Sequence, residues 1–334
     1  MAEAVDIFPG RSAMKRTLFA VLLLGLGYTS SAHAQLAHAQ PEWYLPTGDG
    51  CQLFVQEFGQ GPETVVVLHG GWGAEHSYLL DAFRGLDEMY HLVFYDQRGS
   101  LLSPCPAEKI SIQKHVDDLE LLRATLGLGQ INIVAHSMGT FLAMNYLQRY
   151  PEKVKGVVLF GALPPRTPKD DPEKKLLEEQ QRESHTFIER PEIAAELHRL
   201  GLDRDDSALS AQQRSSAWHI RFGAVNAYHL DRWQYVKGGR AYYNQQSADA
   251  AAKTMPQEWD FTPALAARHC ATWVINGDHD YADPAAKFFQ QVTSSVPGVR
   301  IVVLKDAGHS AWVDAPEDFA KAMSKALEST TQCH

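Results

Sequence analysis

The chain has 334 residues, of which 45% are hydrophobic, and this share suits a soluble globular protein. Its formal net charge of −9 comes without a basic patch, so we expect no nucleic acid partner. The length allows one large domain with an insertion.

The first 34 residues have the pattern of a signal peptide. They contain a positive start, an apolar run and a cleavage motif, at Lys15-Arg16, residues 18–26 and Ala32-His33-Ala34. The apolar run is shorter than the roughly 20 residues that span a bilayer. Residues 1–13 are either an upstream extension or the result of a start codon placed too early. A second cleavage motif at 37–39 allows the cleavage position to vary by about five residues. We therefore expect an exported protein, periplasmic or secreted, with no membrane anchor after cleavage.

From Gln52 onward, short apolar strands alternate with helical segments. The periodicity predicts strands at 53–58, 64–68, 92–95, 131–135, 154–160, 271–275 and 299–304, and helices at 112–126, 284–292 and 316–327. This alternation predicts an α/β fold with a mostly parallel central sheet and helices on both faces. Active sites of such sheets lie at the carboxyl ends of the strands.

Residues 164–262 interrupt the alternation with charged, helix-rich sequence that lacks strand patterns. We interpret them as a helical cap inserted between the core segments 35–163 and 263–334. The second half of the insertion is crowded with aromatic side chains: Trp218, Phe222, Tyr228, Trp233, Tyr235, Tyr242, Tyr243 and Trp259. Most of these rings should pack the cap onto the core, and we expect a minority, Trp218 and Trp233, to bind substrate.

The stretch INIVAHSMG, from Ile131 to Gly139, combines a strand, a sharp turn and the start of a helix. Ser137 lies at its apex. The small residues Ala135 and Gly139, two positions before and two after, let the strand and the helix approach closely. A turn of this kind presents a serine hydroxyl to a base, beside backbone N–H groups that hold an oxyanion. We therefore expect Ser137 to be a nucleophile and the N–H of Met138 to be an oxyanion donor.

A histidine and two aspartates follow later strands, and they offer a base and an acid. Asp278 and Asp280 follow the strand at 271–275, and His309 follows the strand at 299–304. We expect His309 to take the serine proton and return it to the leaving group, while a carboxylate fixes the histidine tautomer. The two aspartates compete for this last role.

With the order Ser, Asp, His, the mature chain resembles the α/β-hydrolase superfamily. Three strings resemble its proline iminopeptidase branch: HGGWG at 69–73, YDQRGS at 95–100 and GHSAW at 308–312. Their counterparts in the branch are HGGPG, DQRGxGxS and the terminal histidine motif. The chain departs from the branch at Trp72, Leu101 and Ala135, where proline, glycine and glycine are usual.

The resemblance implies further site residues. Its G-x-x-D spacing places the acid at Asp280, and Asp278 then caps the turn. Its HGG loop places a second oxyanion donor at the N–H of Gly71. Independently of the resemblance, we expect Trp72 and His136 to contact substrate. For His136, a structural role as a hydrogen-bonded support beside the strand end is the alternative. The branch selects a free substrate amine through acidic residues in its cap.

Other polar residues are expected to support the site. We expect Asp96 and Arg98 to form an ion pair beneath it. No cofactor or metal is expected, because the chain lacks a phosphate-binding glycine loop after its first strand and a cluster with metal-ligand spacing. The four cysteines permit two disulfides in an exported protein, and three pairings of Cys51, Cys105, Cys270 and Cys333 remain open.

Three functions remain open. The favoured one is an exported serine hydrolase that forms an acyl-enzyme and, like the proline iminopeptidases, cleaves a small amide or N-terminal peptide bond. The second is a carboxylesterase or lactonase that acts on a small apolar ester. The third is a ligand-binding protein that has lost turnover, and intact Ser137, Asp280 and His309 weigh against it. For both hydrolases the partner is a small ester, amide or short peptide.

Overall fold

The computed structural model of the chain describes residues 42–238 and 243–333. The expected signal peptide, residues 1–34, and the cap residue Tyr242 lie outside the described residues. Within the described ranges, no helix combines the length and the apolar character that crossing a membrane requires.

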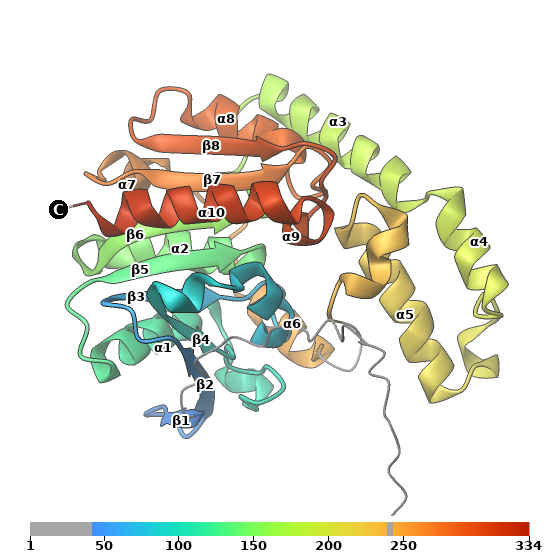
Figure 1. Cartoon of the computed structure of the whole chain (residues 1–334), viewed down its shortest axis with the longest axis horizontal. Helices are drawn as coiled ribbons and strands as arrows, with labels where there is room; N and C mark the ends of the chain where they lie inside the picture. Colours follow the sequence, from blue (N-terminus) through green and yellow to red (C-terminus); the bar gives the residue numbers. More distant parts are fainter. Residues whose placement is uncertain (1–41, 239–242, 334) are drawn as a thin grey trace, which may run out of the picture. The chain divides into compact units, whose positions relative to one another are not determined.

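The described residues form an eight-stranded sheet with the order β1-β2-β4-β3-β5-β6-β7-β8 (Figure 1). β2 runs antiparallel to β1 and β4, and the remaining neighbours pair in parallel. The mostly parallel sheet predicted from the sequence is confirmed. The strands are β1 (Trp43–Pro46), β2 (Gln52–Phe58), β3 (Glu63–Leu68), β4 (Tyr90–Tyr95), β5 (Ile131–His136), β6 (Val154–Phe160), β7 (Thr272–Gly277) and β8 (Val299–Leu304).

Helices cover both faces of this sheet, because alternate side chains of a strand point to opposite sides. In β3, Val66 packs into one hydrophobic cluster while Val65 and Val67 pack into another. The Val66 cluster includes side chains of α1 (Ile112–Thr125), α2 (Met138–Arg149), α6 (Gln245–Ala252), α7 (Thr262–Ala266) and α8 (Lys287–Thr293). The opposite cluster includes side chains of α9 (Ala311–Asp314) and α10 (Pro316–Thr331).

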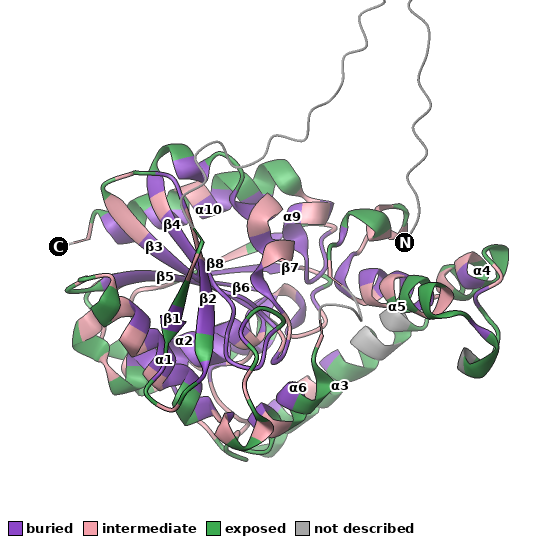
Figure 2. Cartoon of the chain, turned by 90° about the horizontal axis from the view of Figure 1, so that it is seen from below, coloured by how far each residue is buried: buried purple, intermediate pink, exposed green. Residues whose placement is uncertain are grey.

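The insertion after β6 builds α3 (Asp171–Ile188), α4 (Pro191–Arg199) and α5 (Ala211–Asn226), which gather beyond the ends of β7 and β8 (Figure 1). The central strands β3, β5, β6 and β7 are mostly buried, whereas the edge strand β1 and the helix α4 are mostly exposed or half-buried (Figure 2). The sequence placed the cap at 164–262. In the structure Ala248, Ala251 and Phe261 belong to the core cluster of α1 and α2, so the last part of that insertion packs as core.

Two disulfides join Cys51 to Cys105 and Cys270 to Cys333. The first links the start of β2 to the segment behind the DQRG loop. The second links the entrance of β7 to the C-terminal end of the described chain. Of the three pairings that the sequence left open, the structure therefore selects this one.

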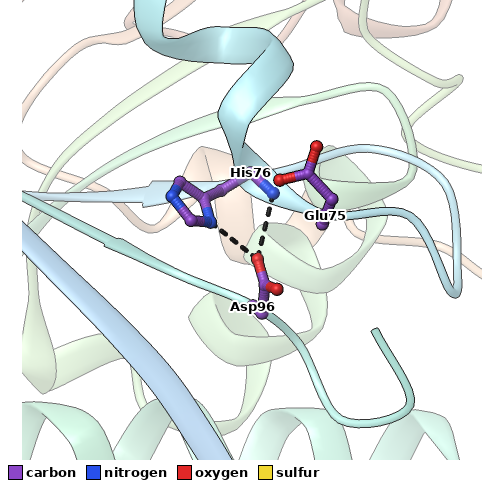
Figure 3. A group of neighbouring side chains, drawn as sticks. All are labelled: Glu75, His76 and Asp96. Carbon is purple, nitrogen blue, oxygen red and sulfur yellow. Dashed lines mark hydrogen bonds and ion pairs between the residues drawn. The ribbon is translucent and has the colours of Figure 1, made fainter. Parts of the chain in front are cut away.

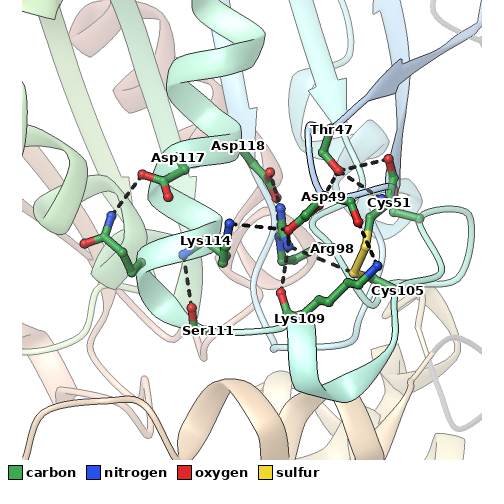
Figure 4. Close-up of polar contacts among 12 residues, drawn as sticks. Thr47, Asp49, Cys51, Arg98, Cys105, Lys109, Ser111, Lys114, Asp117 and Asp118 are labelled. Atoms are coloured by element: carbon green, nitrogen blue, oxygen red, sulfur yellow. Dashed lines mark hydrogen bonds and ion pairs between the residues drawn. A yellow bond between two sulfur atoms is a disulfide. The ribbon is translucent and has the colours of Figure 1, made fainter.

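Asp96 and Arg98 do not pair with each other, and the expected ion pair between them is wrong. Asp96 Oδ1 accepts from His76 N at 3.0 Å and lies 2.6 Å from His76 Nδ1 (Figure 3). Arg98 is 2% exposed, and its Nε and Nη2 donate to Asp118 at 2.6 and 2.5 Å (Figure 4). Its Nη1 donates to Asp49 at 3.0 Å. Each of the two residues has its own charged or polar partners on other elements. The short distance between Asp96 and Arg98 in the sequence does not predict these partners.

We expect Asp118→Asn to destabilise the fold by about 3 kcal/mol, because it leaves the buried Arg98 guanidinium without its bidentate partner. The free energy of unfolding in urea measures this loss. Asp117→Asn is the matched control, since Asp117 forms an exposed pair with Arg149 at 3.0 Å and should contribute less than about 1 kcal/mol. Equal losses in the two variants would contradict this account of Arg98.

Candidate active site

Ser137 occupies a strained turn between β5 and α2. Its φ of 52° and ψ of −125° are unusual for a residue with a side chain. The turn needs a very close approach, because a Cβ at Gly139 would lie 2.7 Å from the carbonyl oxygens of Leu68 and His69. Glycine at 139 therefore lets α2 start directly against the end of β3, and the serine side chain projects above the sheet.

His309 and Asp280 come together from the loops after β8 and β7. His309 Nδ1 lies 2.7 Å from Asp280 Oδ1, and the two residues are 2% and 0% exposed. A carboxylate accepts only, so Nδ1 carries the proton and Nε2 is left as a proton acceptor. Among the described residues, His309 Nε2 has no hydrogen-bond partner. It is thus free to accept a proton within the site.

The two candidate aspartates have different partners in the structure. Asp278 accepts hydrogen bonds from the backbone N–H groups of Asp306 and Ala307, each at 3.1 Å. It therefore ties the loop after β7 to the loop after β8. Asp280 contacts His309 and also accepts from Ala282 N at 2.9 Å. Of the pair, Asp280 is the aspartate placed to orient the histidine.

Backbone N–H groups face the serine from the loop after β3 and from the start of α2. Gly70 N–H donates to the Tyr78 hydroxyl at 2.7 Å and is therefore occupied. The N–H groups of Gly71, whose φ is +65°, and of Met138 have no acceptor within the described part of the chain. These two groups remain able to bind an oxyanion.

His136 supports this loop as a neutral side chain. The Tyr78 hydroxyl lies 2.7 Å from His136 Nδ1, and His136 Nε2 lies 3.2 Å from the His309 carbonyl oxygen. Burial lowers the pKa of His136 well below its usual range, and the nearby His309 lowers it further. The network therefore has Tyr78 donating to Nδ1 and Nε2–H donating to the carbonyl oxygen.

A cavity of about 660 Å³ connects these groups to the cap. Ser137, His309, Gly71, Met138 and His136 line it from the core side. The cap side is largely apolar and aromatic, with Leu163, Pro164, Pro168, Leu177, Trp218, Phe222, Tyr243 and Trp259. The size is that of a small-molecule site.

Two residues expected to bind substrate lie away from this cavity. Trp72 is buried and stacks on His115 of α1, with ring centroids 4.9 Å apart. Trp233 is partly buried and packs against a small cap cluster that includes Leu197 and Ile220. Neither ring lines the cavity that contains Ser137, and an aromatic-rich sequence does not distinguish packing from a pocket wall.

Sequence reasoning missed several residues of the cavity wall, among them Glu75, Tyr78, Arg166 and Tyr281. Glu75 follows the HGGWG string by two positions, and Tyr281 follows Asp280 directly. Their positions next to recognised motifs could have identified them as candidate site residues. The phenol of Tyr281 forms a hydrogen bond with Ser137, and burial raises its pKa, so the phenol stays protonated near neutral pH.

Glu75 is a buried carboxylate, 5% exposed, at the base of the loop after β3 (Figure 3). It accepts from Ser77 N at 2.7 Å and from Ser77 Oγ at 2.6 Å. In the described residues, no lysine or arginine forms an ion pair with it. Its neighbours His76 and Asp96 lie close enough to share a cation with it, but they are hydrogen-bonded to each other.

A family model described as alpha/beta hydrolase fold matches residues 63–316. The proline iminopeptidase of Saccharolobus solfataricus is 24% identical over 272 residues, which cover 79% of this chain and 84% of that protein. The structure of a proline iminopeptidase-related protein from Thermus thermophilus has a TM-score of 0.63 at 22% identity and covers 88% of this chain and 98% of its own. A thermophilic esterase from Thermogutta terrifontis has a TM-score of 0.60 at 21% identity, with coverage of 87% and 99%. The chain belongs to the α/β-hydrolase fold family.

Proposed function

We propose that the chain is a serine hydrolase in which Ser137 is the nucleophile, His309 the base and Asp280 the acid. The observation that carries this proposal is the 2.7 Å contact between His309 and Asp280 in the cavity that Ser137 also lines. Because Nδ1–H of His309 donates to Asp280, the proton stays on Nδ1 and the other ring nitrogen is available to the serine.

The reaction follows from these positions. Ser137 Oγ attacks the substrate carbonyl carbon while its proton passes to His309 Nε2. The N–H groups of Gly71 and Met138 stabilise the negative charge that develops on the carbonyl oxygen. His309 then gives its proton to the leaving group, and an acyl-enzyme remains. A water molecule repeats the sequence, which releases the acid and restores Ser137.

The substrate we propose is a small amide or an N-terminal peptide bond, as in the proline iminopeptidases that the chain resembles. Glu75 supports an amine-bearing substrate. Arg166 also lines the cavity, but it is paired with Glu173 at 2.5 Å. A buried carboxylate is stabilised by a cation, and a substrate ammonium would supply one to Glu75. Glu75 comes from the core loop after β3, whereas the resemblance to the branch suggested acidic residues of the cap.

A carboxylesterase that acts on a small apolar ester is the alternative. The wall formed by Trp218, Phe222 and Trp259 suits an apolar acyl group. The similar fold of a thermophilic esterase is consistent with this chemistry. The two functions share the serine, the histidine and the aspartate, and they differ in whether Glu75 meets a charged group.

We also propose that the protein is exported, with residues 1–34 as a signal peptide and no anchor after cleavage. The two disulfides support this proposal, because such bonds persist in oxidising compartments.

Ser137→Ala should lower turnover by at least about 10⁴-fold, because no other group in the proposed mechanism forms the acyl-enzyme. The assay compares the mature protein and the variant on proline p-nitroanilide and on p-nitrophenyl butyrate. A fluorophosphonate probe should label the mature protein and leave the variant unlabelled. Equal labelling of both would contradict the assignment of Ser137.

Glu75→Gln should lower kcat/KM for proline p-nitroanilide by about 10- to 100-fold, because a charged hydrogen bond to the substrate amine is lost. For the uncharged p-nitrophenyl butyrate we expect less than about a twofold change in the same quantity. Glu178→Gln, at an exposed carboxylate of α3, is the matched control and should change neither substrate. If Glu75→Gln affects both substrates alike, the carboxylate does not recognise the amine.

The full chain, expressed in a Gram-negative host, should appear in the periplasm with its N-terminus at or within about five residues of Gln35. Intact mass spectrometry measures the cleavage position, and thiol titration without reductant should find no free cysteine. Replacing Lys15 and Arg16 by glutamate should block export. Retention of uncleaved chain in the cytoplasm would show that the N-terminal segment is not a signal peptide.

A further inference from the structure

Tyr281 contacts both Ser137 and His309. Its phenol forms a hydrogen bond with Ser137. Its ring centroid lies 4.4 Å from that of His309. The backbone is anchored on both sides of the residue, because Asp280 binds His309 and also accepts from Ala282 N at 2.9 Å. The phenol is therefore held beside the nucleophile by the same carboxylate that orients the base.

The base lacks its partner in the same structure. His309 Nε2 has no hydrogen bond with any described residue, although Ser137 lines the same cavity. For nucleophilic attack, the serine O–H must donate to this nitrogen. In the structure the serine O–H donates to the phenol oxygen of Tyr281 instead, a contact that offsets part of the rise that burial causes in the pKa of the phenol. The reactive arrangement thus requires one hydrogen bond to be exchanged for another.

The position of Tyr281 exposes its phenol to a bound substrate. Tyr281 lines the cavity together with its neighbour Ala282. A substrate that fills the cavity comes into contact with the phenol, whereas a small acyl donor does not need to.

We propose that Tyr281 is a positioning residue that keeps Ser137 away from His309 until a substrate occupies the cavity. The phenol turns to donate to a polar acceptor atom of the substrate, so the serine O–H loses its acceptor, and the released hydroxyl turns to donate to His309 Nε2. Only hydrogen bonds are exchanged in this step. The inference rests on the proposed serine-hydrolase function, and it makes Tyr281 a determinant of selectivity for substrates that fill the cavity.

Tyr281→Phe tests this inference, because it removes one oxygen and keeps the ring against His309. Diisopropyl fluorophosphate, which reacts with the serine without filling the cavity, should inactivate the variant roughly 3- to 10-fold faster than the wild type. The kcat/KM for p-nitrophenyl acetate should rise by a similar factor. For proline p-nitroanilide or p-nitrophenyl butyrate it should stay constant or fall, because the phenol contact with substrate is lost as well.

Tyr78→Phe is the matched control, since it removes another phenol of the site. Tyr78 supports Gly70 and His136, so its loss should slow all of these reagents alike. Thermal melting verifies that both variants fold. Inactivation of Tyr281→Phe at or below the wild-type rate would overturn the proposal and leave the serine hydrolase intact. If diisopropyl fluorophosphate inactivates neither the wild type nor the variant, both the proposed serine-hydrolase function and the proposed role of Tyr281 are wrong.

Discussion

The close approach of β3, β5 and α2 at Ser137 is the constraint on which the candidate site depends. At Gly139 even a methyl group would collide with the carbonyl oxygens of Leu68 and His69, at 2.7 Å. The same contact brings the loop after β3 to the serine. Gly71 and Met138, the oxyanion donors of our proposal, both belong to this junction, and the strain in the Ser137 backbone is maintained by packing on both sides.

The parallel sheet also brings His309 and Asp280 together. β7 and β8 pair in register up to Gly277 and Leu304, so the loops that follow them leave the sheet at the same level. Asp278 then fastens these loops through two backbone hydrogen bonds. With the loops fastened, His309 and Asp280 meet in the interior, away from competing water, where their hydrogen bond is strengthened by the low dielectric.

Selectivity in this site involves core loops as well as the cap. The cap supplies an apolar wall, whereas Glu75 and Tyr281, the two polar groups of our proposals, come from loops of the hydrolase core. Binding residues are often carried by loops that a rigid sheet positions. Variation of these loops can therefore change substrate preference without any change in the catalytic geometry.

The sequence by itself determined the fold class and pointed to the candidates Ser137 and His309, because hydrophobic periodicity and local turn motifs are short-range signals. The choice of Asp280 over Asp278 came from the family resemblance. The sequence missed β1, since a four-residue edge strand has too little periodicity. The tertiary structure alone decided the disulfide pairing, the separate partners of Asp96 and Arg98, and the packing roles of Trp72 and Trp233. All of these features depend on contacts between residues far apart in the chain. A sequence rich in aromatic or charged residues is compatible with many different sets of such contacts, so it does not select one.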